Sequence, residues 1–134
     1  MFEVTLDWHD PGQTILIMDV QANTWEWDKA FTAMRDLKQK SESVEHGVYT
    51  ILIFHNTPTT PGRDVFRNVR EITKFHPKNN ILTIFVGTNK LFRAIFNTVN
   101  KIYLLKNMFD GFRYVATRQQ ALEIIDQEKG EAKS

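Results

Sequence analysis

Two short runs of apolar residues constrain the fold of this chain more than any other feature. Residues 48–54 read VYTILIF and residues 81–87 read ILTIFVG, with almost no alternation between apolar and polar positions. Strands that are apolar on both faces are typical of parallel sheets, because helices cover both sides of such a sheet. Both runs are therefore predicted to be buried parallel strands that are connected through helices.

Helical patterns occur around these runs, as parallel strands require. Apolar residues recur at helical spacing in four segments, namely 23–40, 63–75, 89–102 and the segment after residue 117. Asn23 or Thr24 is the predicted cap of the first helix. Thr117 is the predicted cap of the last, where Gln120 three residues later completes a capping-box pattern.

Three further strands complete the predicted sheet. Residues 2–8 alternate between apolar and polar, which indicates an edge strand with one wet face. The turn DPG at 10–12 joins them to a second strand at 14–20, so that these two strands form a hairpin. Residues 112–115 form the last short strand. The prediction is one α/β domain over residues 1–128, in the order ββαβαβαβα, with an antiparallel hairpin on a mostly parallel sheet and a frayed tail at 129–134.

The composition excludes several classes of protein. The 134 residues are 42% apolar and contain no cysteine, no apolar run long enough for a membrane span and no signal-peptide pattern at the start. We expect a cytoplasmic globular protein without a cofactor. Net charge is −5 over residues 1–62, +8 over 63–118 and −2 over the rest. Folding can either average this asymmetry out or present a basic face to an acidic partner.

Three segments resemble the STAS domain family, and more narrowly its SpoIIAA-like group of small stand-alone proteins. They are TILIMDVQANTWEWDKAFTAM at 14–34, LTIFVGTNKLFRAIF at 82–96 and MFDGFRYVATRQQALEII at 108–125. They are similar to the opening strand and helix, the later strand–glycine–helix unit and the closing strand and helix of that family. The resemblance implies a bacterial signalling or stress-response protein that acts by binding other proteins.

The resemblance also points to one loop. In regulatory STAS domains the loop after the central strand reads Asp-Ser-Ser-Gly or Asp-Ser-Thr-Gly, and a partner kinase phosphorylates the residue before the glycine. The matching residues here are Thr59, Thr60, Pro61 and Gly62. Proline has no hydroxyl group, so we expect the usual phosphorylation switch to be absent. Whether Thr59 or Thr60 is phosphorylated instead stays open.

The same loop has a physical interpretation of its own. It precedes a helix N-terminus, where free N–H groups favour anions, and Thr59 and Thr60 would add hydroxyl donors. Arg63 and Arg67 begin a basic ridge that continues through Arg70 and Lys74 at helical spacing. This ridge suits an acidic protein surface or a small anion. The alternative is an ordinary turn and a solvated helix face. No nucleic-acid-binding module is present.

Aromatic residues give a second candidate site. Trp25 and Trp27 are two positions apart and point to different faces, so at least one is predicted to be exposed or half-buried. Phe92 and Phe96 make the helix at 91–102 more apolar than one buried face needs. Together with Trp25 they are candidates to line a pocket for a lipid-like ligand or to form a dimer contact, and the alternative is ordinary core packing.

No catalytic or metal-binding constellation is predicted. None of the four histidines has HxxxH or HExxH spacing. His55 closes a buried strand beside the threonine loop, but as a general base it would need a nucleophile and an orienting carboxylate. Asp64 is the nearest carboxylate in sequence. A hydrogen bond from His55 to both a hydroxyl and a carboxylate would indicate an enzyme.

The first hypothesis is therefore a non-catalytic STAS-like module that docks onto a regulatory protein or a copy of itself through the threonine loop and the basic helix. The second is a protein of the same fold that binds a nucleotide, an anion or a lipid-like molecule. A pocket larger than about 300 Å³ lined by Phe92, Phe96 or a tryptophan would favour the second. An enzyme is the third.

Overall fold

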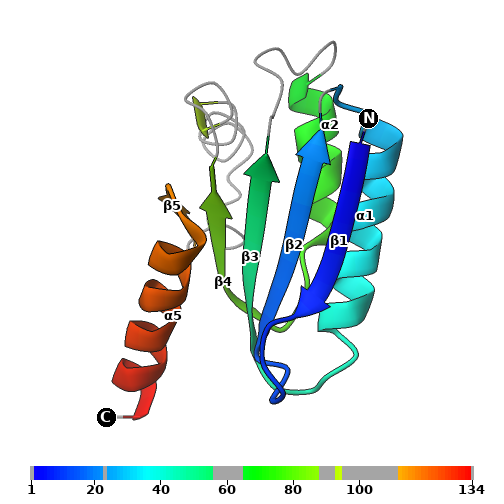
Figure 1. Cartoon of the computed structure of the whole chain (residues 1–134). Helices are drawn as coiled ribbons and strands as arrows, with labels where there is room; N and C mark the ends of the chain where they lie inside the picture. The colour runs from blue at the N-terminus through cyan, green and yellow to red at the C-terminus, as the bar shows by residue number, and fades with distance from the viewer. Residues whose placement is uncertain (1, 23, 56–64, 88–92, 95–111, 134) are drawn as a thin grey trace.

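The protein is built on a five-stranded sheet. A computed structural model describes residues 2–22, 24–55, 65–87, 93–94 and 112–133. The strands lie side by side in chain order, β1 (Phe2–Trp8), β2 (Ile15–Ala22), β3 (Val48–His55), β4 (Asn80–Val86) and β5 (Phe112–Val115) (Figure 1). β1 is antiparallel to β2, and the other neighbouring pairs are parallel. The predicted α/β class, hairpin and mixed sheet are confirmed.

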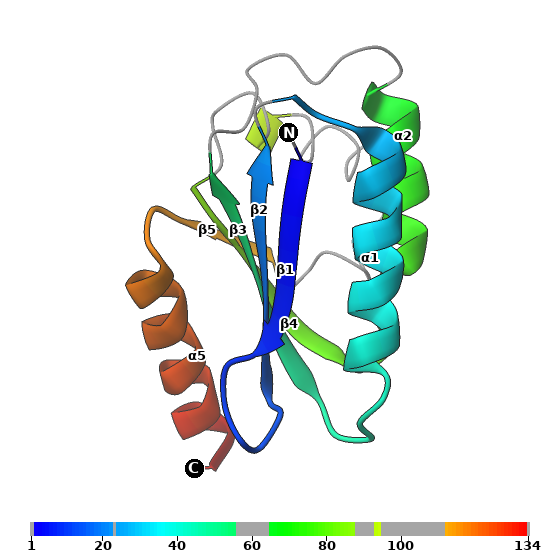
Figure 2. The ribbon, with the colours of Figure 1, turned by 45° about the vertical axis from the view of Figure 1, so that its right-hand side comes forward.

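Helices lie on both faces of this sheet. α1 (Trp27–Ser41) and α2 (Val65–Ile72), which a 3₁₀ turn (Thr73–Phe75) extends, cover one face. α5 (Arg118–Lys133) packs on the other, against β3, β4 and β5 (Figure 2). α1 and α2 share a face because right-handed crossovers between strands in chain order place their helices on the same side. The predicted helix at 91–102 lies outside the described residues except for 93–94.

Of the two predicted helix N-caps, one is confirmed and the other is wrong. The Thr117–Gln120 capping box is confirmed, since the Thr117 hydroxyl accepts from the Gln120 N–H at 3.2 Å and the Gln120 amide accepts from the Thr117 N–H at 3.2 Å. The cap at Asn23 or Thr24 is wrong, because α1 begins at Trp27 and its N-cap is Glu26, which makes no side-chain cap bond. Packing of Trp25 against the aromatic core keeps the chain extended up to this point. α5 continues to Lys133, within the segment predicted to be a frayed tail.

Two apolar cores explain why the central strands have no polar face. Leu16, Leu52 and Phe85 point toward α1 and α2, whereas Ile51 and Ile84 point toward α5. All five side chains are buried. Alternate residues of one strand thus enter different cores, and each core excludes water from one face of the sheet.

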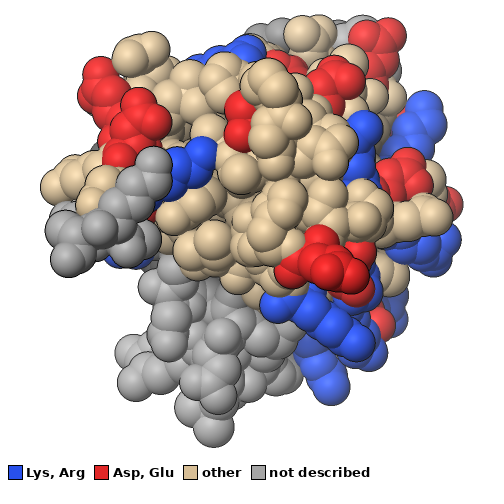
Figure 3. Space-filling view, turned by 90° about the horizontal axis from the view of Figure 1, so that it is seen from below, with Lys and Arg blue, Asp and Glu red and all other residues tan. Residues whose placement is uncertain are grey.

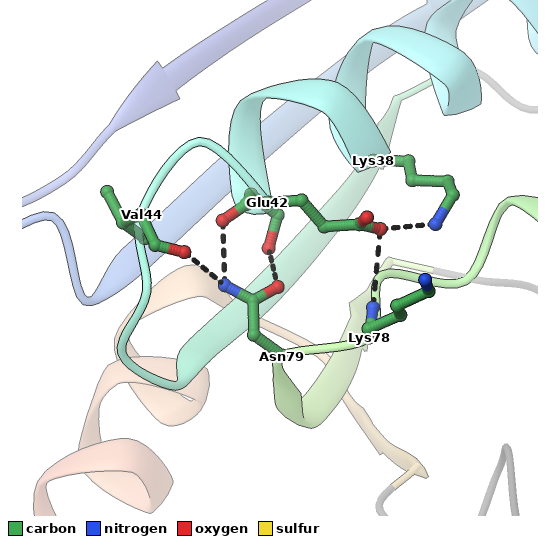
Figure 4. Close-up of polar contacts among 6 residues, drawn as sticks. Lys38, Glu42, Val44, Lys78 and Asn79 are labelled. Atoms are coloured by element: carbon green, nitrogen blue, oxygen red, sulfur yellow. Dashed lines mark hydrogen bonds and ion pairs between the residues drawn. The ribbon is translucent and has the colours of Figure 1, made fainter.

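One asparagine joins the loops at the amino ends of the parallel strands. The Asn79 side chain donates to the backbone oxygens of Ser41 at 2.7 Å and Val44 at 3.2 Å, and it accepts from the Ser41 hydroxyl at 3.1 Å (Figure 4). It also donates to the backbone oxygen of His46 at 3.0 Å. Its own backbone oxygen accepts from the Val48 N–H at 2.9 Å. Asn79 therefore ties the end of α1 to the start of β3.

The hairpin turn is tied to α5 in a similar way. The Asp10 carboxylate accepts from the Thr14 hydroxyl at 2.5 Å and from the Ile15 N–H at 2.9 Å, and the Lys129 ammonium donates to the Thr14 hydroxyl at 2.6 Å. Burial alone would raise the pKa of the Asp10 carboxyl. The hydrogen bonds from Thr14 and Ile15, aided by the charge of Lys129, outweigh burial and lower this pKa below its ordinary value of 3.8.

A pH-dependent contribution to stability follows from this lowered pKa. Because the folded state favours the ionised carboxyl, Asp10 stabilises the fold above pH 3.8, and this contribution is lost as the pH falls through the folded-state pKa. Asp10→Asn is expected to lower the free energy of unfolding by about 1 kcal/mol at neutral pH. The gap to wild type should shrink in urea titrations below pH 3.8, and a gap that stays constant would contradict the assignment.

Candidate functional site at the carboxyl edge of the sheet

The carboxyl ends of the parallel strands form the edge at which open α/β sheets place their ligands. β3 ends at His55, and Gly87 directly follows β4. Gly87 has a φ of 77°, and its N–H donates to the Val115 oxygen of β5 at 3.2 Å. This edge therefore brings together residues that are far apart in the sequence. The predicted loop residues Thr59, Thr60, Gly62 and Arg63 lie outside the described residues.

A carboxylate and an imidazole meet at this edge. His55 Nε2 lies 3.1 Å from the Asp19 carboxylate, which comes from the neighbouring strand β2. Both side chains are partly exposed, at 46% for His55 and 31% for Asp19, so water screens their interaction. Sequence reasoning named Asp64 as the nearest carboxylate, and Asp64 lies outside the described residues. Sequence reasoning did not single out Asp19, although this residue is the only carboxylate within the apolar segment TILIMDV.

The pair has part of what acid–base chemistry requires. A carboxylate bonded to one ring nitrogen orients the imidazole and leaves the other nitrogen, Nδ1, to exchange a proton. In the part of the chain that the structure describes, no hydroxyl hydrogen-bonds to the His55 ring. Within the same ranges, no group of three or more His, Asp or Glu side chains is placed to hold a metal ion. Of the two His55 hydrogen bonds that would indicate an enzyme, the one to a carboxylate is present and the one to a hydroxyl is not found among the described residues.

Aromatic rings line the other face of the same edge. Trp25, which is half-buried, lies 6.4 Å from Phe54 between ring centroids, and Phe54 lies 6.1 Å from Phe85. Phe85 stacks on Tyr114 at 5.3 Å. Burial raises the pKa of the Tyr114 hydroxyl, which the nearby charge of Arg93 partly offsets. The row crosses β3, β4 and β5 and belongs to the core under α1 and α2.

The side chain of Trp25 carries a buried polar group, its indole N–H. Its Nε1 atom is buried, and among the described residues no atom accepts a hydrogen bond from it. The predicted pocket around Trp25, Phe92 and Phe96 stays a prediction, because both phenylalanines lie outside the described residues. A separate groove of about 220 Å³ lies between β1 and α1, and its lining does not include Trp25.

Three of the four residues of the predicted basic ridge lie among the described residues. Arg67, Arg70 and Lys74 are exposed on α2 and the 3₁₀ turn after it. The Lys74 ammonium pairs with the Glu71 carboxylate at 2.9 Å. This hydrogen bond lowers the pKa of Glu71, and the charges of Arg70 and Arg67 add to the effect. Among the described residues of α2 and the 3₁₀ turn after it, one carboxylate, Glu71, thus lies among three cations.

The end of the molecule opposite the carboxyl edge carries charged side chains of both signs. Figure 3 shows this end with basic and acidic side chains next to one another near its margins and a mainly uncharged centre.

Comparison with protein-family models, with curated proteins and with solved structures found no match to this chain. The STAS resemblance therefore stays a prediction, and the fold itself is that of a small α/β protein with a five-stranded mixed sheet. In the described ranges, no helix combines the length and the apolar character that crossing a membrane requires.

Proposed function

We propose that this protein is a non-catalytic STAS-like regulatory module that docks onto an acidic surface of a partner protein. The observation that carries the proposal is the exposed cationic face of α2, where Arg67 and Arg70 lie in the first two turns of the helix. Arginine is the side chain best suited to this task, because its planar guanidinium can bind a carboxylate through two hydrogen bonds.

Pro61 and the Asp19–His55 pair support protein binding rather than catalysis. Pro61 occupies the position at which the family carries its phospho-acceptor, so this loop would bind a partner without the usual switch. The Asp19–His55 pair beside it is partly exposed and lacks a hydroxyl partner among the described residues. A surface of this kind gains specificity and a fast association rate from charge complementarity.

Reversal of one charge on α2 tests the proposal. Arg67→Glu is expected to lower recovery of the partner from a lysate of the native host about tenfold, because it places a carboxylate against an acidic surface. Recovery is measured by quantitative mass spectrometry of pull-downs. Arg118→Glu is the matched control, since it makes the same change of charge at an exposed position of α5 on the other face of the sheet.

Two further measurements complete this experiment. Circular dichroism checks that both variants keep the fold, so that lost binding is not confused with unfolding. Binding of the recovered partner should also weaken at higher salt, because exposed charges are screened. Equal recovery by Arg67→Glu and by wild type would remove α2 from the docking surface.

The alternative proposal is a protein that binds a small anion or a lipid-like molecule. The buried Trp25 N–H supports it, because a buried donor for which no described residue provides an acceptor suits a ligand oxygen. Native mass spectrometry of the protein isolated from its own host would report such a ligand, together with the oligomeric state and any phosphate.

A further inference from the structure

β1 is a long and regular open edge of the sheet. Its register with β2 runs without a bulge from the Phe2–Ala22 pair to the Trp8–Leu16 pair, and among the described strands β1 pairs with β2 alone. The other edge, β5, has only four residues. An edge strand presents unpaired N–H and C=O groups and can accept a further strand from another chain.

The register shows which backbone groups of β1 face outward. The His9 N–H donates to the Ile15 oxygen at 2.8 Å, so the His9–Ile15 pair is hydrogen-bonded. In an antiparallel ladder, hydrogen-bonded and non-hydrogen-bonded pairs alternate. The odd-numbered residues of β1 therefore bond to β2. The N–H and C=O groups of Val4 and Leu6 point away from β2, toward the open edge.

The side chains of these same residues line a groove. Val4 and Leu6 are half-buried and, with Phe2, form one wall of the groove of about 220 Å³ between β1 and α1. Ala33 and Asp36 of α1 lie on the other wall. Outward-facing backbone groups and a partly apolar groove thus occur side by side, which is the arrangement that strand addition uses.

The charge around this edge is acidic. Glu3 and Asp7 are exposed on the face of β1 away from the groove, and Asp36 is exposed beside the groove. No ion pair within the described ranges neutralises any of these three carboxylates. The lysine that lines the groove, Lys29, forms an ion pair with Glu26 at 3.3 Å and so adds little free positive charge.

We propose that the β1 edge binds an extended peptide segment of a partner protein in which apolar and basic residues alternate. Backbone hydrogen bonds to Val4 and Leu6 would add the segment to the sheet as a sixth strand. Its apolar side chains would enter the groove, because residues beside Val4 and Leu6 point to the same face. Its basic side chains would lie beside Glu3 and Asp7 on the other face.

A second copy of the chain fits this edge less well. Antiparallel pairing of two β1 strands about Thr5 would place Glu3 of each copy opposite Asp7 of the other, and like charges directly opposite one another destabilise a sheet. The proposed site is separate from the α2 surface, so each can fail without the other.

The probe is the fluorescent peptide acetyl-Lys-Val-Lys-Leu-Lys-Val-Lys-amide, and binding is measured by fluorescence anisotropy. Its control has the same composition with the three apolar residues placed next to one another. The double variant Glu3→Lys/Asp7→Lys is expected to bind the alternating peptide about tenfold more weakly, and to gain affinity for the peptide in which every lysine is replaced by glutamate. Glu123→Lys/Asp126→Lys, at exposed positions of α5, is the matched charge control.

The backbone component has its own test. Val4→Pro removes an outward-facing N–H without removing a bond to β2, and should abolish binding while circular dichroism shows a retained fold. Peptides N-methylated at the lysines or at the apolar residues provide the same test without changing the protein. One of the two should lose binding and the other keep it, because strand addition uses alternate nitrogens. Equal binding of both methylated peptides, or of the alternating and control peptides, would overturn the proposal.

Discussion

Gly87→Ala is expected to lower the free energy of unfolding by about 3 kcal/mol. Gly87 has a φ of 77°, a conformation that side chains with a Cβ atom rarely adopt. A Cβ atom at this position would also lie 2.7 Å from the backbone oxygen of Phe54. That oxygen belongs to the central strand and cannot move aside without disturbing the sheet. The loss is measured by urea denaturation monitored by circular dichroism.

The chain provides a matched control for this substitution. Gly130 lies inside α5, and apart from the neighbouring residues and backbone of its own helix no described atom lies within 4 Å of the position that its Cβ would occupy. Gly130→Ala should therefore raise stability by about 0.5–1 kcal/mol, because alanine favours the helix. If Gly87→Ala unfolds at the same urea concentration as wild type, the close approach of β4 to Phe54 is not present.

Gly87 also matters for the candidate site. Its N–H bonds to Val115, so it holds the ends of β4 and β5 together at the carboxyl edge. His55 directly follows Phe54 on β3, and a displaced Phe54 oxygen would shift the His55 side chain away from Asp19. We expect the Gly87→Ala protein to show an altered His55 imidazole resonance by NMR even under conditions in which it stays folded.

Asn79→Ala is expected to lower stability by about 3 kcal/mol as well. The substitution removes the two N–H donors that the side-chain amide shares among the backbone oxygens of Ser41, Val44 and His46. It also removes the bond that the amide oxygen accepts from the Ser41 hydroxyl (Figure 4). Each bond contributes about 1 kcal/mol, and the partly buried oxygens would lose their donor. Urea denaturation measures this loss.

Two companion variants separate the hydrogen bonds from other effects. Asn79→Asp keeps the size of the side chain but places a carboxylate oxygen against three backbone oxygens, so it should be at least as destabilising as Asn79→Ala. Lys78→Ala changes the exposed neighbour and should stay within about 0.5 kcal/mol of wild type. A loss below about 1 kcal/mol for Asn79→Ala would show that water replaces these bonds.

The candidate site was only partly predictable from the sequence. His55 was identified at the end of its strand because the apolar run stops there, which is local information. Its partner Asp19 is 36 positions away, and the contact depends on how β2 aligns with β3. A shift by one residue would turn Asp19 to the other face of the sheet. Asp64 was named because it is close to His55 in sequence. Closeness in sequence contains no information about the register between strands, so it could not identify Asp19.

The sequence by itself determined the class of the fold and the positions of its strands. Apolar runs of seven residues and helical spacing report local burial, because a residue's face depends only on its position within its own element. Tertiary structure alone decided three other features: the Asp19–His55 pair, the bridging role of Asn79 and the open groove beside β1. Each depends on which elements lie side by side, and on the register between them, which the periodicity of a single segment does not contain.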